Sequence, residues 1–245
     1  MKIGHIILVS CIVAALAVLL RLGFWQLERL EWKEGLIARV ESGLTKPPVD
    51  LDSIEQALRD GDDIEYRPVT VSGTFDHANE QHFYTTFRSQ AGYHVYTPLR
   101  EVSGRILMVN RGFVPFTAKE ASNRKEGQIT GSVSFDGLAR SAPANKPNAF
   151  VFDNDLIKNV YHWKSLSQML GRAYDKMDIN ARPFFVDIRT MKTPATVPGN
   201  MPIAGVTRIT FSNSHLSYAV TWFGLAATLL FVGIPFTWKR IRGSA

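Results

Sequence analysis

Two long apolar stretches lie near the ends of the chain, at residues 3–20 and 216–238. Each is close to the ~20 residues that a helix needs to cross the hydrocarbon core of a bilayer. The pattern predicts two transmembrane helices, one within residues 1–24 and one within residues 214–238. A cleaved signal peptide is the alternative for the first stretch, because Ala-Leu-Ala at 15–17 is a possible cleavage signature. The apolar run continues past that signature, which favours a helix that is retained.

The polar pattern changes between these stretches. Short runs of β-branched and aromatic residues alternate with Gly, Pro, Asn and Asp, which is typical of strands joined by turns. Residues 45–213 are therefore expected to form one α+β domain with a mainly antiparallel sheet, for which a barrel-like form is one solution. The predicted strands are residues 66–75, 82–87, 93–99, 105–113, 129–139 and 183–188.

Capping-box patterns predict two short helices in this domain. Asp52 and Glu55 precede the first, and Ser165 and Gln168 precede the second. Gly171 is placed to end the second helix. Proline, glycine and asparagine predict loops at 142–150 and 190–205.

Charge changes the picture mainly at the two ends of the chain. Lys and Arg exceed Asp and Glu by 28 to 22, but the middle domain is nearly balanced and has no basic patch with interleaved aromatics, so no nucleic-acid partner is expected. The single cysteine, Cys11, lies in an apolar run, which excludes a disulfide framework or a Cys-x-x-Cys site within the chain.

Basic residues beside the apolar stretches predict the orientation. The tail at 239–245 contains lysine and arginine and no acid, which places it in the cytoplasm by the positive-inside rule. Cations in the amphipathic junction at 25–44 argue the other way, with acidic neighbours. Following the tail, we expect both termini in the cytoplasm and residues 45–213 outside it. Because the first helix begins near residue 3 without an Arg-rich presequence, the inner membrane of a bacterial cell is expected, with a periplasmic middle domain.

Motifs for common catalytic chemistries are missing from the sequence. It has no Gly-x-Ser-x-Gly, P-loop, His-Glu-x-x-His or dinucleotide fingerprint. His77 and His82 lie near Asp76 and Glu80, but a solvated hairpin is favoured over a zinc site because short motifs have a high false-positive risk. The sequence therefore predicts a protein that is not an enzyme.

The junction after the first apolar stretch contains a cluster of aromatic and basic residues. Helical spacing places Trp25, Arg29 and Trp32 on one face, and Gln26 and Lys33 overlap that face. An aromatic belt with snorkelling cations explains the pattern. The alternative is an anion site, because like charges at Arg29 and Lys33 are mildly unfavourable unless something neutralises them.

The junction before the second stretch contains a histidine. His215, Tyr218 and Trp222 share one stripe of the predicted helix. A neutral imidazole can ligate iron, and the aromatic surface below it could hold a flat hydrophobic macrocycle. The alternative is an interfacial histidine in a helix that Asn213 or Ser214 caps.

Six segments in this order resemble the Surfeit locus protein one family, assembly factors of haem-copper cytochrome oxidases. The resemblance covers nearly the whole chain and includes the motif Asn-x-His-Leu-x-Tyr at 213–218. The segments are GFWQLERLEWK, YRPVTVSGTF, GYHVYTPL, VNRGFVP, GQITGSVSFDGLAR and NSHLSYAVTWFGLA.

The resemblance implies a role at the catalytic subunit of the oxidase while its haem is installed, with haem a transiently bound. His215 corresponds to the family histidine and would be the axial ligand of the metal. Tyr218, Trp222, Trp25 and Trp32 would pack on the ring, and Arg29 or Lys33 would pair with its propionates.

The resemblance also implies partners in the oxidase catalytic subunit, the haem a synthesis or delivery machinery and the lipid bilayer. The competing hypothesis is a membrane scaffold that steadies the oxidase subunit without holding haem. A third, an enzyme that alters haem or a substrate, has only the scattered histidines in its favour.

Overall fold

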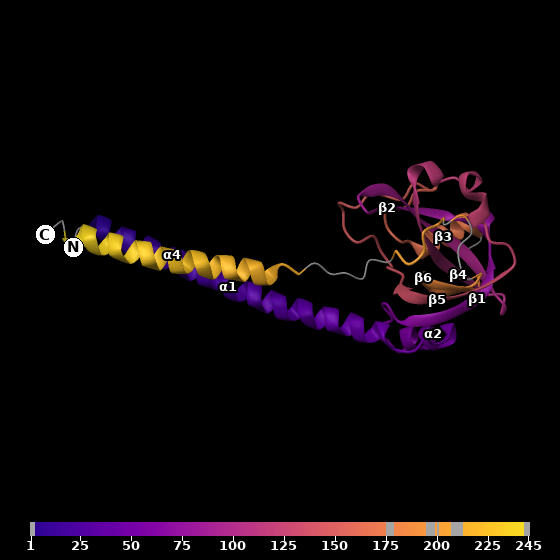
Figure 1. The fold of residues 1–245 in the computed structure, drawn as a ribbon, viewed down its shortest axis with the longest axis horizontal. Coiled ribbons are helices and arrows are strands. Elements are labelled where there is room, and N and C mark those ends of the chain that lie inside the picture. Colours follow the sequence, from indigo (N-terminus) through magenta and orange to yellow (C-terminus); the bar gives the residue numbers. More distant parts are fainter. Residues whose placement is uncertain (1–2, 175–178, 195–198, 200, 207–212, 243–245) are drawn as a thin grey trace. The chain divides into compact units, whose positions relative to one another are not determined.

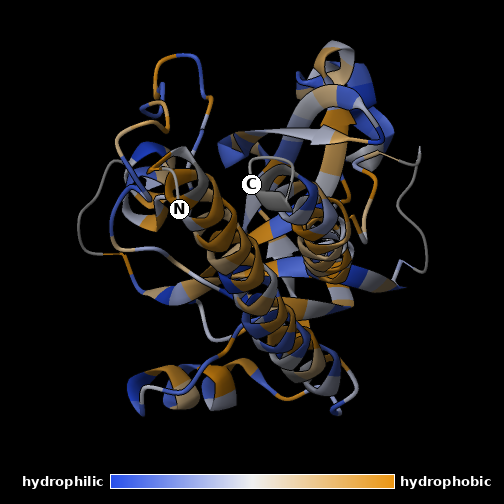
Figure 2. Cartoon of the chain, turned by 90° about the vertical axis from the view of Figure 1, so that its left-hand side faces the viewer, coloured by the Kyte–Doolittle hydropathy of each residue, from blue (hydrophilic) through white to orange (hydrophobic). Residues whose placement is uncertain are grey.

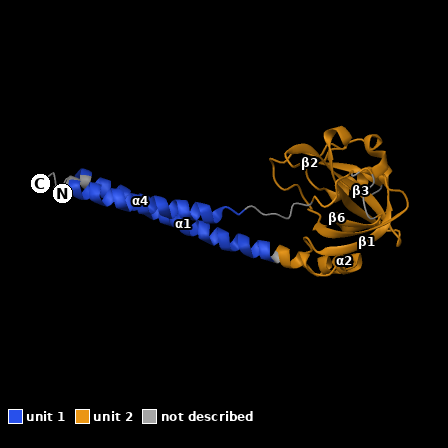
Figure 3. Ribbon diagram, viewed as in Figure 1, with its two compact units in different colours: residues 1–39, 210–245 blue, residues 40–209 orange. Residues whose placement is uncertain are grey.

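The computed structural model describes the chain except for residues 1–2, 175–178, 195–198, 200, 207–212 and 243–245. By its internal contacts the chain divides into two compact units (Figure 3). Residues 1–39 and 210–245 form a helical unit, which we call the helix pair, and residues 40–209 form an α+β unit, which we call the sheet domain. The predicted boundaries at 45 and 213 lie close to this division, and residues 243–245 of the predicted tail lie outside the described residues.

Helix α1 (Ile3–Leu44) is one continuous helix of 42 residues, about 63 Å long at 1.5 Å per residue. It therefore includes both the predicted first span and the amphipathic junction at 25–44. Figure 2 shows apolar residues dominating the part near the N-terminus, with polar residues more frequent farther along. Because the apolar part alone is long enough for a bilayer core, the remaining turns can extend beyond it.

Helix α4 (His215–Arg242) has 28 residues and includes Pro235. The hydroxyls of Thr221 and Thr228 donate to carbonyls one turn earlier in α4, so both are satisfied within the helix. Both α1 and α4 are long and apolar enough to cross a membrane, yet only 6% and 11% of their most apolar windows are buried. A core helix of a soluble protein would be mostly covered by protein, so the exposed apolar faces are those expected of helices surrounded by lipid.

The sheet domain contains a six-stranded mixed sheet (Figure 1). Its order is β1-β5-β6-β4-β3-β2, and β1 also pairs with β3. The β4–β6 pairing is parallel and the other described pairings are antiparallel, which confirms the mainly antiparallel sheet. The β1–β3 pairing requires the sheet to curve back on itself; a closed barrel stays a prediction. The strands are β1 (Pro68–Phe75), β2 (Gln81–Phe87), β3 (Gln90–Glu101), β4 (Ile106–Pro115), β5 (Ser132–Ser141) and β6 (Ala181–Thr193).

All six predicted strands are present. Buried and exposed side chains alternate in β1, as a half-buried strand requires, whereas nearly all of β4 is buried. In β1, Val69 and Val71 are buried while Thr70 and Ser72 face outward. These inward residues join Leu107 of β4 and others in one core. The core also includes Leu99, Val109, Val133, Phe135, Phe184, Val186 and Ile188.

Both predicted helices exist, but the capping prediction is wrong for the first. In α2 (Leu51–Arg59) the N-cap is Asp50, whose carboxylate accepts a hydrogen bond of 2.7 Å from the Ser53 amide. Asp52 already lies inside the helix, and Glu55 instead forms ion pairs with Arg105, just before β4, and Arg182 of β6. An N-cap needs an extended backbone and an oxygen that reaches the N3 amide, and only Asp50 meets both conditions.

Helix α3 (Leu166–Tyr174) begins as predicted and ends later than predicted. The Ser165 hydroxyl accepts a hydrogen bond from the Gln168 amide at 3.4 Å. Gly171 lies within the helix rather than at its end. The loop predicted at 190–205 is also partly wrong, since β6 continues to Thr193 in pairing with β5; residues 195–198 and 200 lie outside the described residues.

Candidate functional site

A polar contact joins α1 and α4 at the first turn of α4. The Nδ1 atom of His215 lies 2.7 Å from Oε1 of Gln26. Gln26 is only 8% exposed and the His215 side chain is half-buried. Burying an amide without a partner is costly, so this hydrogen bond compensates for placing Gln26 between apolar helices.

A close approach of the helices, one turn from Gln26, allows this contact. A Cβ atom at Gly23 would lie 2.7 Å from the ring of Phe223, so the absence of a side chain lets that ring sit on the backbone of α1. Phe24 meets the same ring edge-on, with ring centroids 5.4 Å apart. On α4, Ala219 is 1% exposed and so also lies in the contact. Small residues at helix interfaces are the usual means of close packing in membranes.

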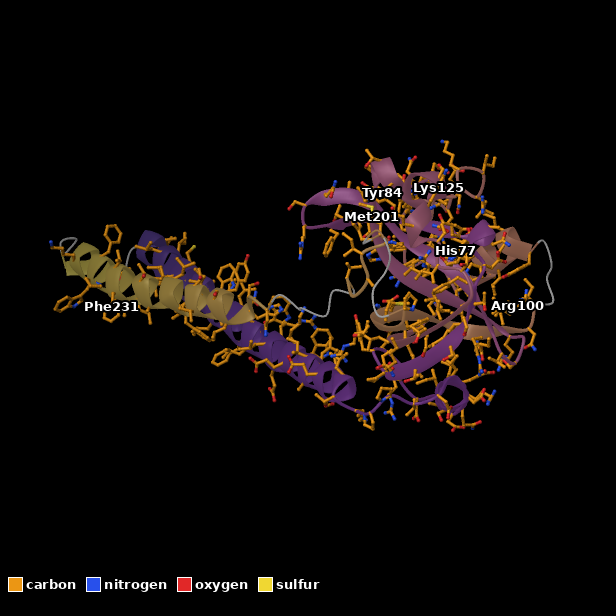
Figure 4. All side chains as sticks on the ribbon, turned by 45° about the vertical axis from the view of Figure 1, so that its right-hand side comes forward. His77, Tyr84, Arg100, Lys125, Met201 and Phe231 are labelled. Atoms are coloured by element: carbon orange, nitrogen blue, oxygen red, sulfur yellow. The ribbon has the colours of Figure 1, made fainter. Side chains whose placement is uncertain are left out.

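The residues predicted beside His215 have different environments. Tyr218 is 54% exposed and therefore faces away from α1. Trp222 is half-buried, and its indole Nε1 atom is buried with no hydrogen-bond partner among the described residues. The stripe His215, Tyr218 and Trp222 is thus split between a surface that packs on α1 and one that is open. Farther along α4, Phe231 points outward and is 80% exposed (Figure 4).

The α1 residues predicted for the site lie mostly on open surface. The guanidinium of Arg29 stacks over the ring of Trp32 at 4.3 Å, as their spacing suggested. Trp25 and Trp32 are 42% and 51% exposed. Lys33 is half-buried, seven residues after Gln26 and hence on nearly the same face. The α1 side chain bonded to His215 is thus Gln26, which the sequence placed next to the candidate residues but not among them.

The donor set limits the kind of metal centre that the helix pair can hold. Within the described residues, no three His, Cys, Asp or Glu side chains gather where they could bind a metal ion. His215 can supply one nitrogen ligand through Nε2. A metal bound here must therefore bring most of its ligands with it, as iron in a macrocycle does. The exposed aromatic rings and the unpartnered indole N–H of Trp222 fit such a group, because they offer ring surface and a donor for a peripheral oxygen.

His77 and His82 lie inside the sheet domain, so the solvated hairpin predicted for them is wrong. His77 lies inside the sheet domain (Figure 4), with Nε2 2.8 Å from the Ile129 carbonyl and Nδ1 3.2 Å from Arg111. His82 is 4% exposed and lies 3.3 Å from the Glu80 carboxylate.

The carboxylate of Glu80 is held in its charged form inside the domain. Burial alone would raise its pKa, but hydrogen bonds from His82 and Arg124 lower the pKa below its usual value. Arg124, which belongs to the 3-10 helix η3 (Ala121–Gly127), also donates to the Ala118 carbonyl at 2.9 Å. These groups therefore tie loops together.

Comparison with known proteins finds relatives that match most of the chain. Residues 13–227 match the sequence model of the SURF1 family, a range that includes Gln26 and His215. The chain is 35% identical over 240 residues to human Surfeit locus protein 1, covering 91% of this chain and 74% of the human protein.

SURF1-like proteins of two other organisms also match most of the chain. A SURF1-like protein of Monosiga brevicollis is 35% identical over 221 residues, covering 85% of this chain and 79% of that one. A SURF1-like protein of Rickettsia felis is 27% identical over 239 residues, covering 95% of each chain. With a match over most of its length and relatives above 30% identity, the chain belongs to the SURF1 family.

Proposed function

We propose that this protein is a membrane-anchored assembly factor for a haem-copper cytochrome oxidase, which binds haem a and assists its insertion into the catalytic subunit. Family membership supports the assembly role, and the sequence resemblance suggests the oxidase as the client. The protein acts as a chaperone and catalyses no covalent step.

The observation that carries the haem assignment is the environment of His215. Its imidazole is held at the start of α4 by Gln26, in a helix pair that offers a metal one nitrogen ligand and much aromatic surface. Haem iron takes an imidazole as an axial ligand and brings its own equatorial ring. His215 would hold the iron, and Tyr218 and Trp222 would pack on the macrocycle. The indole N–H of Trp222 would find in the ligand the acceptor that it lacks among the described residues.

The cations of α1 would contribute electrostatic attraction. Arg29 is exposed, and Lys33 is half-buried near the face that carries Gln26. Carboxylates of a propionate-bearing macrocycle would form charge-assisted hydrogen bonds with them. Trp25 and Trp32 would add ring contacts and anchor α1 at the membrane surface.

The membrane arrangement follows from the two helices and the basic tail. Both termini would lie in the cytoplasm of a bacterial cell and the sheet domain in the periplasm. His215 and Gln26 would then lie at the periplasmic side of the inner membrane. The oxidase catalytic subunit and the machinery that makes or delivers haem a are the partners in this arrangement.

A scaffold that stabilises the oxidase subunit without holding haem is the second candidate. It is favoured by the many exposed apolar side chains of α1 and α4, which could pack on the helices of a client as well as on lipid. Protein purified in detergent from cells that make haem a separates the two functions. Bound haem with an axial-histidine spectrum supports the chaperone, and colourless protein that still captures the oxidase subunit supports the scaffold.

The variant His215→Ala tests the ligand assignment directly. We expect it to lose most of its haem, or to change its haem spectrum, while remaining folded and inserted, because the neighbouring rings cannot replace an axial nitrogen. The control is His162→Ala, which removes a histidine of the sheet domain whose ring centroid lies 5.8 Å from that of Tyr84. Full haem with an unchanged spectrum in His215→Ala would refute the assignment. Loss of haem with normal oxidase assembly in cells would favour the scaffold.

A further inference from the structure

We infer that Gln26 is the positioning residue that sets which ring nitrogen of His215 can act as a ligand. This inference rests on the proposed function, since it concerns how the same imidazole is prepared for a metal. Gln26 touches His215 and is not itself a metal ligand. Its role is to fix the proton on one nitrogen and so present the lone pair of the other.

The direction of the hydrogen bond leads to this assignment. The atom that faces Nδ1 of His215 is Oε1 of Gln26, at 2.7 Å. A carbonyl oxygen only accepts, so Nδ1 must carry the hydrogen and donate it. A neutral imidazole has a single N–H, and therefore Nε2 carries the lone pair. Nε2 is the nitrogen that remains for a ligand bond.

Burial keeps the alternative tautomer unfavourable. Gln26 is 8% exposed, so water has little access to replace the imidazole as partner of its carbonyl. If the proton moved to Nε2, the carbonyl oxygen would face the lone pair of Nδ1. With the amide in its present orientation, two acceptors would then meet in an apolar setting. The hydrogen bond would return only if the amide turned over so that its NH2 group donated to Nδ1.

The close packing of the helices one turn before Gln26 keeps its side chain within reach of His215. One turn before it, Gly23 lets the Phe223 ring approach to a distance at which a Cβ would be 2.7 Å away. Phe24 contacts the same ring edge-on. This fixes the local spacing of α1 and α4, so the amide of Gln26 reaches His215 without spanning a gap. The fixed helix spacing thus keeps the Gln26 side chain within hydrogen-bond distance of His215.

The neutral amide also suits the purpose better than an acid at this position. A carboxylate beside Nδ1 would favour the imidazolium, in which both nitrogens carry protons and neither can bind a metal. The amide carbonyl orients the ring without adding a charge. Partners that orient a ligating histidine in this way typically change metal affinity by about 10–100-fold when they are removed.

The experiment uses the full chain in lipid nanodiscs, prepared without haem and with 15N-labelled histidine. Ring nitrogen chemical shifts of His215, assigned by comparison with His215→Ala, report the tautomer directly. We expect the Nδ1–H form in the wild-type chain and a mixture of both tautomers in Gln26→Leu. Gln26→Glu retains an acceptor, so its neutral imidazole should remain in the Nδ1–H form, with a larger imidazolium population at a given pH.

Haem a titration of the same samples supplies the second measurement. We expect Gln26→Leu to bind about 10–100-fold more weakly than the wild type, and Gln26→Glu at high pH to recover most of that loss. Because leucine fills similar volume and the helix pair is held by Gly23 and Phe223, helix content by circular dichroism should be unchanged. If Gln26→Leu loses helix content, the test rests on Gln26→Glu instead. The neutral imidazole of His215 must then have the same tautomer in that variant as in the wild type.

The outcomes separate the two proposals. A predominant Nδ1–H tautomer in Gln26→Leu, or haem affinity equal to that of the wild type, overturns the role of Gln26 even if His215→Ala loses haem. An Nε2–H tautomer in the wild-type chain overturns it as well. If His215→Ala retains haem, the proposed function fails and the positioning of a ligand by Gln26 fails with it, whatever the tautomer.

Discussion

The sheet domain and the helix pair both bury polar side chains, but they satisfy them differently. In the sheet domain, Arg182 is 3% exposed and makes two 2.8 Å hydrogen bonds to Glu101 and another to Glu55. In the helix pair, Gln26 has the one imidazole of His215. The Arg182 guanidinium is bonded to carboxylates, whereas Nε2 of His215 has no hydrogen bond among the described residues.

This difference distinguishes polar groups that stabilise the fold from a polar group that is available to bind a ligand. A buried charge without a partner is costly, and in the sheet domain Arg182 lies among carboxylates that offset this cost. Asp187 likewise accepts hydrogen bonds from Asn110 and Arg140 at 3.0 and 2.8 Å. A group that must bind something else cannot be fully satisfied by the protein. His215 meets that condition, and the following predictions test the contrast.

The largest effect is expected at Arg182. Replacing it with leucine leaves Glu101 and Glu55 short of a cation, and breaking such a buried pair costs about 3–5 kcal/mol. Urea unfolding of the full chain in detergent, followed by the circular dichroism of the sheet, measures this loss. Arg59→Leu is the matched control, because Arg59 contacts the same Glu55 at 3.0 Å but is 59% exposed and should contribute about 0–1 kcal/mol. Equal losses in the two variants would remove the distinction.

The second effect is a pH dependence of the sheet domain. Burial lowers the pKa of His94 from 6.5 to about 4, against a smaller opposing effect of Asp187 and with Lys164 and Arg140 adding to the decrease. The Phe83 ring also stacks on it at 6.5 Å. Between pH 6.5 and 4 the unfolded chain binds the proton and the folded chain does not, so stability falls as the pH falls through this window. The loss from this group is about 3 kcal/mol.

His94→Gln checks the origin of that slope. The variant should unfold with a smaller stability difference between pH 7 and pH 4.5 than the wild type. Some slope should remain, because burial also lowers the pKa of His77. A wild-type slope in His94→Gln would show that another group carries the dependence.

The third effect concerns the helix pair. Gly23→Ala places a methyl group against the Phe223 ring, and overpacking of this kind costs about 1–3 kcal/mol. In Gly35→Ala nothing lies within 4 Å of the new Cβ, so that variant should be neutral or stabilised by about 0.5–1 kcal/mol. We expect only Gly23→Ala to weaken haem retention.

Disulfide formation measures the helix spacing independently. Cysteines at positions 12 and 233 should cross-link in a Cys11→Ser background, because a Cβ added at Gly233 would lie 3.7 Å from side-chain carbons of Ile12. Adding Gly23→Ala should slow the cross-linking, and adding Gly35→Ala should leave its rate unchanged. Slowing by both substitutions would mean that the alanine effect is general to α1.

The smallest effect is at the start of α2. Asp50→Ala removes the side-chain acceptor of the Ser53 amide and should cost about 1 kcal/mol in the urea experiment. Asp52→Ala should cost less, because Asp52 is 82% exposed and its pair with Arg182 is open to solvent. The reverse order would restore the capping box that the sequence pattern indicated.

A strand with one buried face is predictable from the sequence, because apolar residues then occupy alternate positions. Val69 and Val71 face inward in β1 and the polar residues between them face outward, a pattern that needs no knowledge of neighbouring strands. The cap of α2 failed for the opposite reason. Glu55 has the right local position for a capping box, but its partners Arg105, just before β4, and Arg182, in β6, are distant along the chain.

The candidate site was predicted in part for the same reason. Helical spacing relates residues of one helix, so it could relate His215 to Tyr218 and Trp222 but not to its partner on α1. Gln26 lies 189 residues away along the chain. A signal for it exists in the sequence, since the small Gly23 and the polar Gln26 lie one turn apart just after the first apolar stretch. The buried state of His82 had no local signal, because Arg124 and Glu80 enclose it only after folding.

The position of β6 in the sheet determines when the domain can be completed during synthesis. It is the last of the described strands along the chain, yet it lies between β5 and β4. Until residues 181–193 have left the ribosome, β4 and β5 each present an unpaired edge, and such edges pair readily with other chains. A polypeptide that ends before Ala181 would therefore be prone to aggregation rather than partly active. A chaperone that covers these edges would be needed until residues 181–193 can pair with β4 and β5.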